Sequence, residues 1–160
     1  MATDQIPNLW PTDEIVVDVL PPLVILRAQA SNLRLMTKGI LEAEINTLRG
    51  SGGRLQHQLE ILVPALEHYR RRLLTATHDE NMVYPVYVDD ETPEVDTANA
   101  LLGREVGDLI SAGMRGVRKP VRCSTQDVFI ETLQQILRSS TVKSLVQSLI
   151  ARSNEIRASA

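Results

Sequence analysis

The chain has 160 residues, of which 43% are hydrophobic and 23% charged, and its formal net charge is −3. This length and composition are typical of one soluble globular domain that buries an adequate core without a disulfide or a structural metal. Aromatic residues make up only 3% of the chain, so we expect an aliphatic core. The acidic balance disfavours sequence-independent nucleic-acid binding, which needs clustered lysine and arginine.

The N-terminal residues have no features of a secretory signal. They are acidic and interrupted by proline, and they lack a basic segment followed by an apolar run. No stretch approaches the ~18 continuous apolar residues that a transmembrane helix needs. We therefore expect a cytoplasmic protein with no membrane contact. We interpret residues 1–14 as an irregular lead-in to a single domain that spans residues 1–160.

Cys123 is the single cysteine of the sequence. One thiol excludes an intrachain disulfide and a cysteine-rich zinc site. We interpret Cys123 as an inert, semi-buried residue, with a reactive nucleophile as the alternative. His57 is expected to be a hydrogen-bonded residue near the core and His78 to be solvated at a hairpin end. Histidine spacing does not match a helical zinc site, so the sequence predicts no metal and no cofactor.

The first regular elements are predicted to be a helix and a run of strands. Ile15–Val19 is rich in β-branched residues, which suit a short strand. Residues 22–37 have apolar positions at helical spacing, with prolines at the start and Gly39 as the expected C′ residue. From Leu41 the apolar period changes to two. This alternation predicts strands at about 41–47, 55–63, 68–77 and 83–88.

The second half of the chain is predicted to hold an acidic loop and helices. Residues 89–97 are rich in carboxylates but lack the ligand spacing of a calcium-binding loop, so we interpret them as solvated. Residues 97–112 have helical periodicity, and two more amphipathic helices follow with a break at Ser139. The tail from Ser153 is expected to fray. The pattern predicts an α+β fold: a four-stranded antiparallel meander packed on one face by an N-terminal helix and C-terminal helices.

Polar residues gather on one face of the predicted sheet. Alternation places carboxylates of two strands beside basic residues of a third strand. We expect cross-strand pairing on a solvated surface, with a concave face that binds an anionic ligand as the alternative. The candidate residues of this face are Glu44, Glu60, His68, Arg70 and Arg72.

Two further groups of residues are candidates for binding. A local basic cluster after the predicted helix at 97–112 keeps nucleic-acid binding as a weaker hypothesis. Its residues are Arg115, Arg118, Lys119 and Arg122. Aromatic side chains are candidates for contact with a protein partner; for the tryptophan we expect packing over an edge of the core, with partner binding as the alternative. The candidate partner-binding aromatics are Trp10, Tyr84 and Tyr87.

Several phrases along the chain resemble a group of uncharacterised bacterial proteins. They are PLVILRAQASNLRLMTKG at 22–39, LEAE at 41–44, LVPAL at 62–66 with Tyr69 and Arg70, Thr77-His78, Tyr84-Pro85-Val86, and the segment from Asp127 to Ser140. The resemblance implies a small cytosolic α+β protein. It carries no activity and therefore assigns no catalytic residue.

The sequence contains no motif that predicts a reaction. We therefore expect a non-enzymatic interaction module that self-associates or joins a protein complex, because amphipathic helices and an edge strand offer binding surfaces. The alternative is an enzyme that processes a small ligand or a nucleotide on the polar face of the sheet. An enzyme should hold those side chains in an enclosed pocket, whereas an interaction module should leave them flat and expose apolar surface elsewhere.

Overall fold

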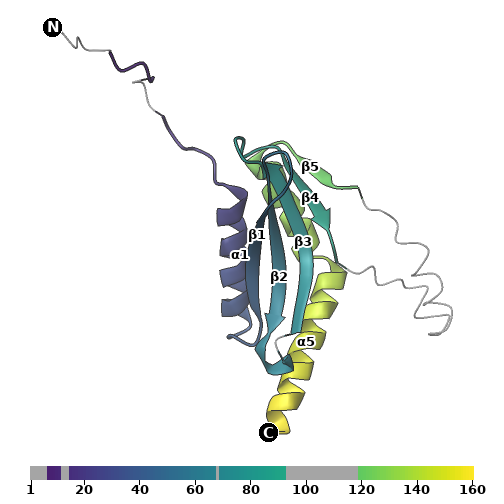
Figure 1. Cartoon of the computed structure of the whole chain (residues 1–160). Helices are drawn as coiled ribbons and strands as arrows, with labels where there is room; N and C mark the ends of the chain where they lie inside the picture. Colours follow the sequence, from purple (N-terminus) through teal and green to yellow (C-terminus); the bar gives the residue numbers. More distant parts are fainter. Residues whose placement is uncertain (1–6, 12–14, 68, 93–118) are drawn as a thin grey trace.

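The computed structural model describes residues 7–11, 15–67, 69–92 and 119–160. The chain begins with α1 (Pro22–Met36), β1 (Glu42–Arg49), β2 (Arg54–Val63), the short 3₁₀ helix η1 (Pro64–Leu66), β3 (Tyr69–Asp79) and β4 (Val86–Asp90). It ends with β5 (Val121–Cys123), α4 (Gln126–Leu137) and α5 (Ser140–Ala158). The strands form one antiparallel sheet in the order β1-β2-β3-β4-β5 (Figure 1).

The α+β class and the antiparallel sheet are confirmed, but the described residues form five strands where four were predicted. The added strand, β5, is three residues long, which is too short to show an alternating pattern in the sequence. β4 begins later than predicted, at Val86, and it includes Asp89 and Asp90 of the predicted acidic loop. The predicted helix at 97–112 lies outside the described residues.

The predicted helix at 22–37 is confirmed as α1, and its C-terminus explains the glycine that follows. The N–H of Gly39 donates to the carbonyl of Arg34 at 2.9 Å, and the N–H of Lys38 donates to that of Leu35 at 3.2 Å. This is a Schellman motif, in which residues after the helix adopt positive φ. Lys38 takes the C′ place predicted for Gly39, with φ values of 53° and 78° for the two residues.

Two predictions at the ends of the chain are wrong. Ile15–Val19 forms no strand in the structure. α5 continues to Ala158, so the tail from Ser153 is helical for most of its length where fraying was expected. Ser139 begins this helix as its N-cap, because its hydroxyl accepts a hydrogen bond from the N–H of Val142 at 3.3 Å.

A β-bulge between β2 and β3 decides which side chains share a face of the sheet. Leu59 lies opposite Leu74, but Glu60 lies opposite Arg72, so Leu73 is an extra residue on β3. Unbroken alternation predicts Leu74 and Arg72 on the same face, and that prediction is wrong because the bulge turns them to opposite faces. The leucine therefore joins the core while the arginine stays with Glu60.

An aliphatic core fills the space between one face of the sheet and the helices. We call this face the helix face. α1 lies alongside β1, and the C-terminal helices lie toward β3 and β4 (Figure 1). Fully buried side chains come from helices and strands alike, which shows that these elements pack as one core. The largest of them include Leu26, Leu41, Ile61, Leu74, Val86 and Phe129.

Candidate functional site

The face of the sheet opposite the helix face carries a network of ion pairs, and we call it the polar face. Arg70 Nη1 on β3 lies 3.0 Å from Glu44 Oε2 on β1 and 3.5 Å from Glu60 Oε2 on β2. Arg72 Nε lies 3.3 Å from Glu60 Oε1. The structure therefore brings together four of the predicted residues of this face. The fifth, His68, lies outside the described residues.

Glu60 is the centre of the network and is only 8% exposed. Besides the two arginines, Asn46 Nδ2 donates a hydrogen bond to Glu60 Oε2 at 3.2 Å. Arg72 Nη1 also lies 3.6 Å from Glu91 Oε2. Opposite charges thus face one another across three strands, as cross-strand pairing predicts. An anionic ligand would have to displace a carboxylate from Arg70 or Arg72 to bind them.

The three candidate aromatic residues have different surroundings. Trp10 is 77% exposed and does not pack over the core, so that prediction is wrong. Tyr84 is half-buried, with its ring edge-on to Phe129 at a centroid distance of 6.4 Å. Burial raises the pKa of Tyr84, with smaller contributions from Cys123 and Asp127, so its hydroxyl remains a hydrogen-bond donor. Tyr87 is exposed on β4.

Two buried histidines form a hydrogen-bonded pair on the helix face of the sheet, near the turn that connects β1 to β2. His57 Nε2 lies 3.0 Å from His78 Nε2, and His57 Nδ1 lies 2.9 Å from Thr47 Oγ1. His78 Nδ1 lies 2.8 Å from the carbonyl oxygen of Asp79. His78 is buried, so its predicted position in solvent is wrong, whereas the prediction of a hydrogen-bonded His57 near the core is confirmed.

The partners of the histidine pair determine where its protons lie. A carbonyl oxygen only accepts, so His78 Nδ1 carries the hydrogen and neutral His78 accepts at Nε2. His57 therefore donates from Nε2, and its Nδ1 accepts from the hydroxyl of Thr47. Burial, then the charges of His78 and Arg27, lower the pKa of His57 from 6.5 to about 4. His57 is therefore neutral at pH 7.

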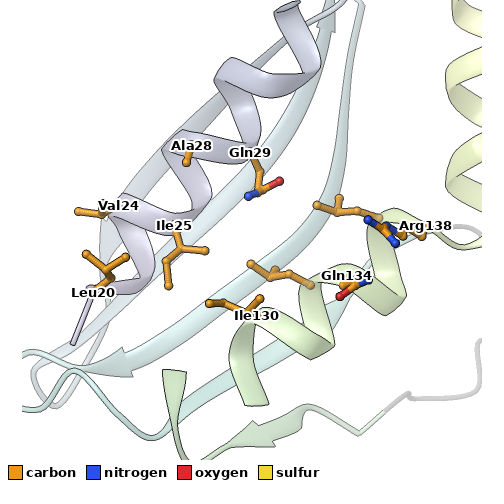
Figure 2. Close-up of a pocket in the computed structure, with 10 residues that line it drawn as sticks. Leu20, Val24, Ile25, Ala28, Gln29, Ile130, Gln134 and Arg138 are labelled. Atoms are coloured by element: carbon orange, nitrogen blue, oxygen red, sulfur yellow. The ribbon is translucent and has the colours of Figure 1, made fainter. Parts of the chain in front are cut away.

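An apolar groove of about 400 Å³ lies between α1 and α4, and we call it the α1–α4 groove. The side chains of Ile25 and Gln29 on α1 face those of Ile130 and Gln134 on α4 across it (Figure 2). Helical spacing explains this lining, because residues four apart share one side of a helix. Arg138 lies at the C-terminal end of α4 and adds a positive charge to the lining.

Exposed aliphatic side chains continue the α1–α4 groove into solvent. Val24 on α1 is 46% exposed and Ile130 on α4 is 41% exposed. α4 also has apolar side chains outside the groove lining that are buried in the core, Phe129 and Ile136. Thr125 fixes the start of α4, since its hydroxyl accepts from the N–H of Val128 at 3.3 Å. The groove therefore lies between two helices that are each held by the core.

The sequence prediction missed the α1–α4 groove and the histidine pair. A helix pattern shows which residues are apolar but not how far apart two helices pack, so Val24 and Ile130 carried no signal of a groove. The sequence did contain a weak signal of the histidine pair. The register of β2 and β3 places Leu55 opposite His78, so His57 is the diagonal neighbour of His78.

Within the described ranges, no three His, Cys, Asp or Glu side chains lie together as metal ligands would. No helix of the described part of the chain is both long and apolar enough to cross a membrane. Comparison of the chain with protein-family models, with curated proteins and with solved structures gives no match.

Proposed function

We propose that this protein is a non-enzymatic interaction module that binds an apolar protein segment in the α1–α4 groove. The observation that carries the proposal is the exposed aliphatic lining of this groove, with Val24 and Ile130 on opposite walls. Solvent-exposed apolar surface of this kind is costly unless a partner covers it. A groove between two helices is a common receptor for an apolar helix or strand of another protein.

The contrast between the two faces of the sheet supports the proposal. The charged groups of the polar face are paired with one another, as Arg70 with Glu44 and Arg72 with Glu60. Exposed aliphatic side chains instead line the α1–α4 groove. This is the distribution expected of an interaction module. Catalysis on the polar face and nucleic-acid binding remain predictions; Arg115 and Arg118 of the basic cluster lie outside the described residues.

The proposal is tested by the mass of the assembly purified from the native host. Ala28 is exposed on α1 and lines the α1–α4 groove, so Ala28→Glu places a carboxylate in the groove without disturbing the core. Ala151→Glu makes the same chemical change at an exposed position of α5 and is the matched control. Both substitutions are helix-compatible, and circular dichroism checks the fold.

We expect the wild-type chain and Ala151→Glu to purify in the same assembly, heavier than the 17.8 kDa chain. Ala28→Glu should lose the partner and give a smaller mass, because burying an unpaired carboxylate in an apolar contact is unfavourable. The proposal would be contradicted if the wild-type chain and both variants purified with the same mass, most clearly if all of them were monomers.

A further inference from the structure

The segment that precedes α1 leaves large aliphatic side chains in solvent, and we call residues 15–20 the N-terminal arm. Val17 is 81% exposed, and the neighbouring aliphatic residues of the arm are exposed as well. The arm leaves the start of α1 and extends away from the sheet (Figure 1). Its β-branched residues favour an extended backbone, which is a narrow shape that suits a groove between helices.

Two hydrogen bonds fix the base of the N-terminal arm at Leu20. The N–H of Leu20 donates to Gln126 Oε1 at 2.7 Å, and the hydroxyl of Tyr84 donates to the carbonyl of Leu20 at 2.9 Å. Pro21 follows in an extended conformation and leads directly into α1. Leu20 itself lines the α1–α4 groove, so the arm begins at the edge of the groove of its own chain and then leaves it.

The charges of the arm and of the α1–α4 groove are complementary. Residues 1–20 contain four acidic side chains and no lysine or arginine, and Asp18 lies within the arm. Among the described residues that line the groove, Arg138 alone is charged, and α1, which forms one wall, has no acidic residue. An acidic apolar segment is therefore favoured over a basic one as the occupant of this groove.

We propose that the α1–α4 groove binds the N-terminal arm of a second copy of this chain, so that two copies exchange arms. This inference rests on the proposed function and names the partner. Each copy offers one arm and one groove, and a reciprocal exchange about a two-fold axis uses both and closes the assembly. The exchange covers the exposed aliphatic side chains of arm and groove in one step, and it brings the acidic arm to a groove that Arg138 lines.

The exchange is tested with purified protein by mixing two variants in an ultracentrifuge. Val16→Ser with Val17→Ser makes the arm polar at exposed positions, and Ala28→Glu blocks the groove. Each variant alone should self-associate at least ~10-fold more weakly than the wild-type chain, because apolar burial is lost at both contacts. An equal mixture retains one intact arm and one intact groove and should form a heterodimer that neither variant forms alone.

Disulfide trapping identifies the two surfaces that meet. Val17→Cys in one tagged chain and Ala28→Cys in another should form a covalent pair on oxidation, whereas Ser144→Cys on the exposed side of α5, paired with Val17→Cys, should not. Cys123 is buried and does not interfere. A double variant with Val17→Cys and Ala28→Cys in one chain reports docking of the arm into its own groove, as an intrachain disulfide in a monomer.

Three results would overturn the exchange. One is a wild-type chain that stays monomeric at all concentrations, and another is the intrachain disulfide as the main product. The third is an arm variant that associates like the wild-type chain while Ala28→Glu does not. The last result leaves the proposed function standing with another occupant, whereas an Ala28→Glu chain that keeps every partner removes the proposed function itself.

Discussion

The His57–His78 pair is a buried hydrogen bond between two imidazole rings, and the burial of His57 makes stability depend on pH. Protonation of His57 would remove the acceptor that the Thr47 hydroxyl uses and bring a positive charge beside His78 and Arg27. The folded chain therefore resists the proton, and the pKa of His57 falls from 6.5 to about 4. Between pH 6.5 and about 4, the unfolded chain therefore binds a proton at His57 that the folded chain does not bind.

We predict that the free energy of unfolding decreases as pH falls from about 6.5 to about 4. The shift of His57 corresponds to a loss of roughly 3 kcal/mol over that window. His57→Gln cannot take up the proton, so its free energy of unfolding should depend less steeply on pH, although it should be less stable at pH 7. Urea unfolding at several pH values measures both slopes, and equal slopes would exclude His57 as the source.

Cys123 has the surroundings of a structural thiol. It is fully buried, and burial raises its pKa, although a hydrogen bond to Thr132 at 3.4 Å acts in the opposite direction. A protonated, covered thiol is a poor nucleophile. The prediction of an inert residue, made from the sequence, therefore gains a physical basis.

We expect an aromatic disulfide reagent to label Cys123 only when the chain unfolds. Labelling should be slow without denaturant and should follow the unfolding transition when urea is added. Ser124→Cys provides the control, because Ser124 is exposed next to Cys123 and an added thiol there should react at once. Rapid labelling of the folded wild-type chain would show that Cys123 is accessible.

At the scale of elements, the polar face ties β1, β2 and β3 together through Glu60. Glu60 forms ion pairs with Arg70 and Arg72 and accepts a hydrogen bond from Asn46, and its side chain is mostly buried. Among the described residues, Glu44 forms an ion pair with Arg70 alone, and both of these side chains are about half exposed. Water screens the outer pair far more than the inner ones.

We predict that Glu60→Gln lowers the free energy of unfolding by about 2 kcal/mol, because it leaves two arginines without their shared carboxylate. Glu44→Gln should cost less than about 1 kcal/mol. Urea denaturation of the two variants at low and high salt makes the comparison. Equal costs for the two substitutions would show that burial of Glu60 does not strengthen its pairs.

The same strands show how far the sequence predicts the structure. Regular alternation predicted β1 and β2 closely. Successive side chains of a strand point to opposite faces of the sheet, so apolar residues recur at every second position where one face is buried. The bulge at Leu73 could not be predicted from the sequence, because an extra residue shifts the register of the strand pair without changing the composition of the strand. Four residues of the polar face were nevertheless predicted, because Arg70 and Arg72 precede the bulge and keep their own alternation; the fifth candidate, His68, lies outside the described residues.

The α1–α4 groove could not be predicted in the same way. The two helices that form it are about a hundred residues apart in the sequence, and their spacing depends on how each packs on the sheet. Each helix carries buried apolar side chains that the sequence does show, Leu26 on α1 and Phe129 and Ile136 on α4. The exposed apolar residues of the two helices can be recognised as the walls of one groove only when the positions of both helices are known.

At the scale of the whole molecule, the described residues form two surfaces of opposite character. The polar face of the sheet satisfies its charges internally, whereas the helix side leaves the α1–α4 groove and the N-terminal arm apolar and open to solvent. A chain of this kind is expected to reach its stable form with a partner, and its apparent stability should rise with protein concentration if the partner is a second copy.

The most direct test of this account is the reactivity of a thiol placed in the α1–α4 groove. Ala28→Cys lies in the groove, and Ala151→Cys on α5 is the exposed control. In the purified assembly we predict slow labelling at Ala28→Cys and fast labelling at Ala151→Cys, with the difference disappearing when dilution separates the partners. Equal and rapid labelling of both thiols in the intact assembly would show that nothing occupies the groove and would contradict the account.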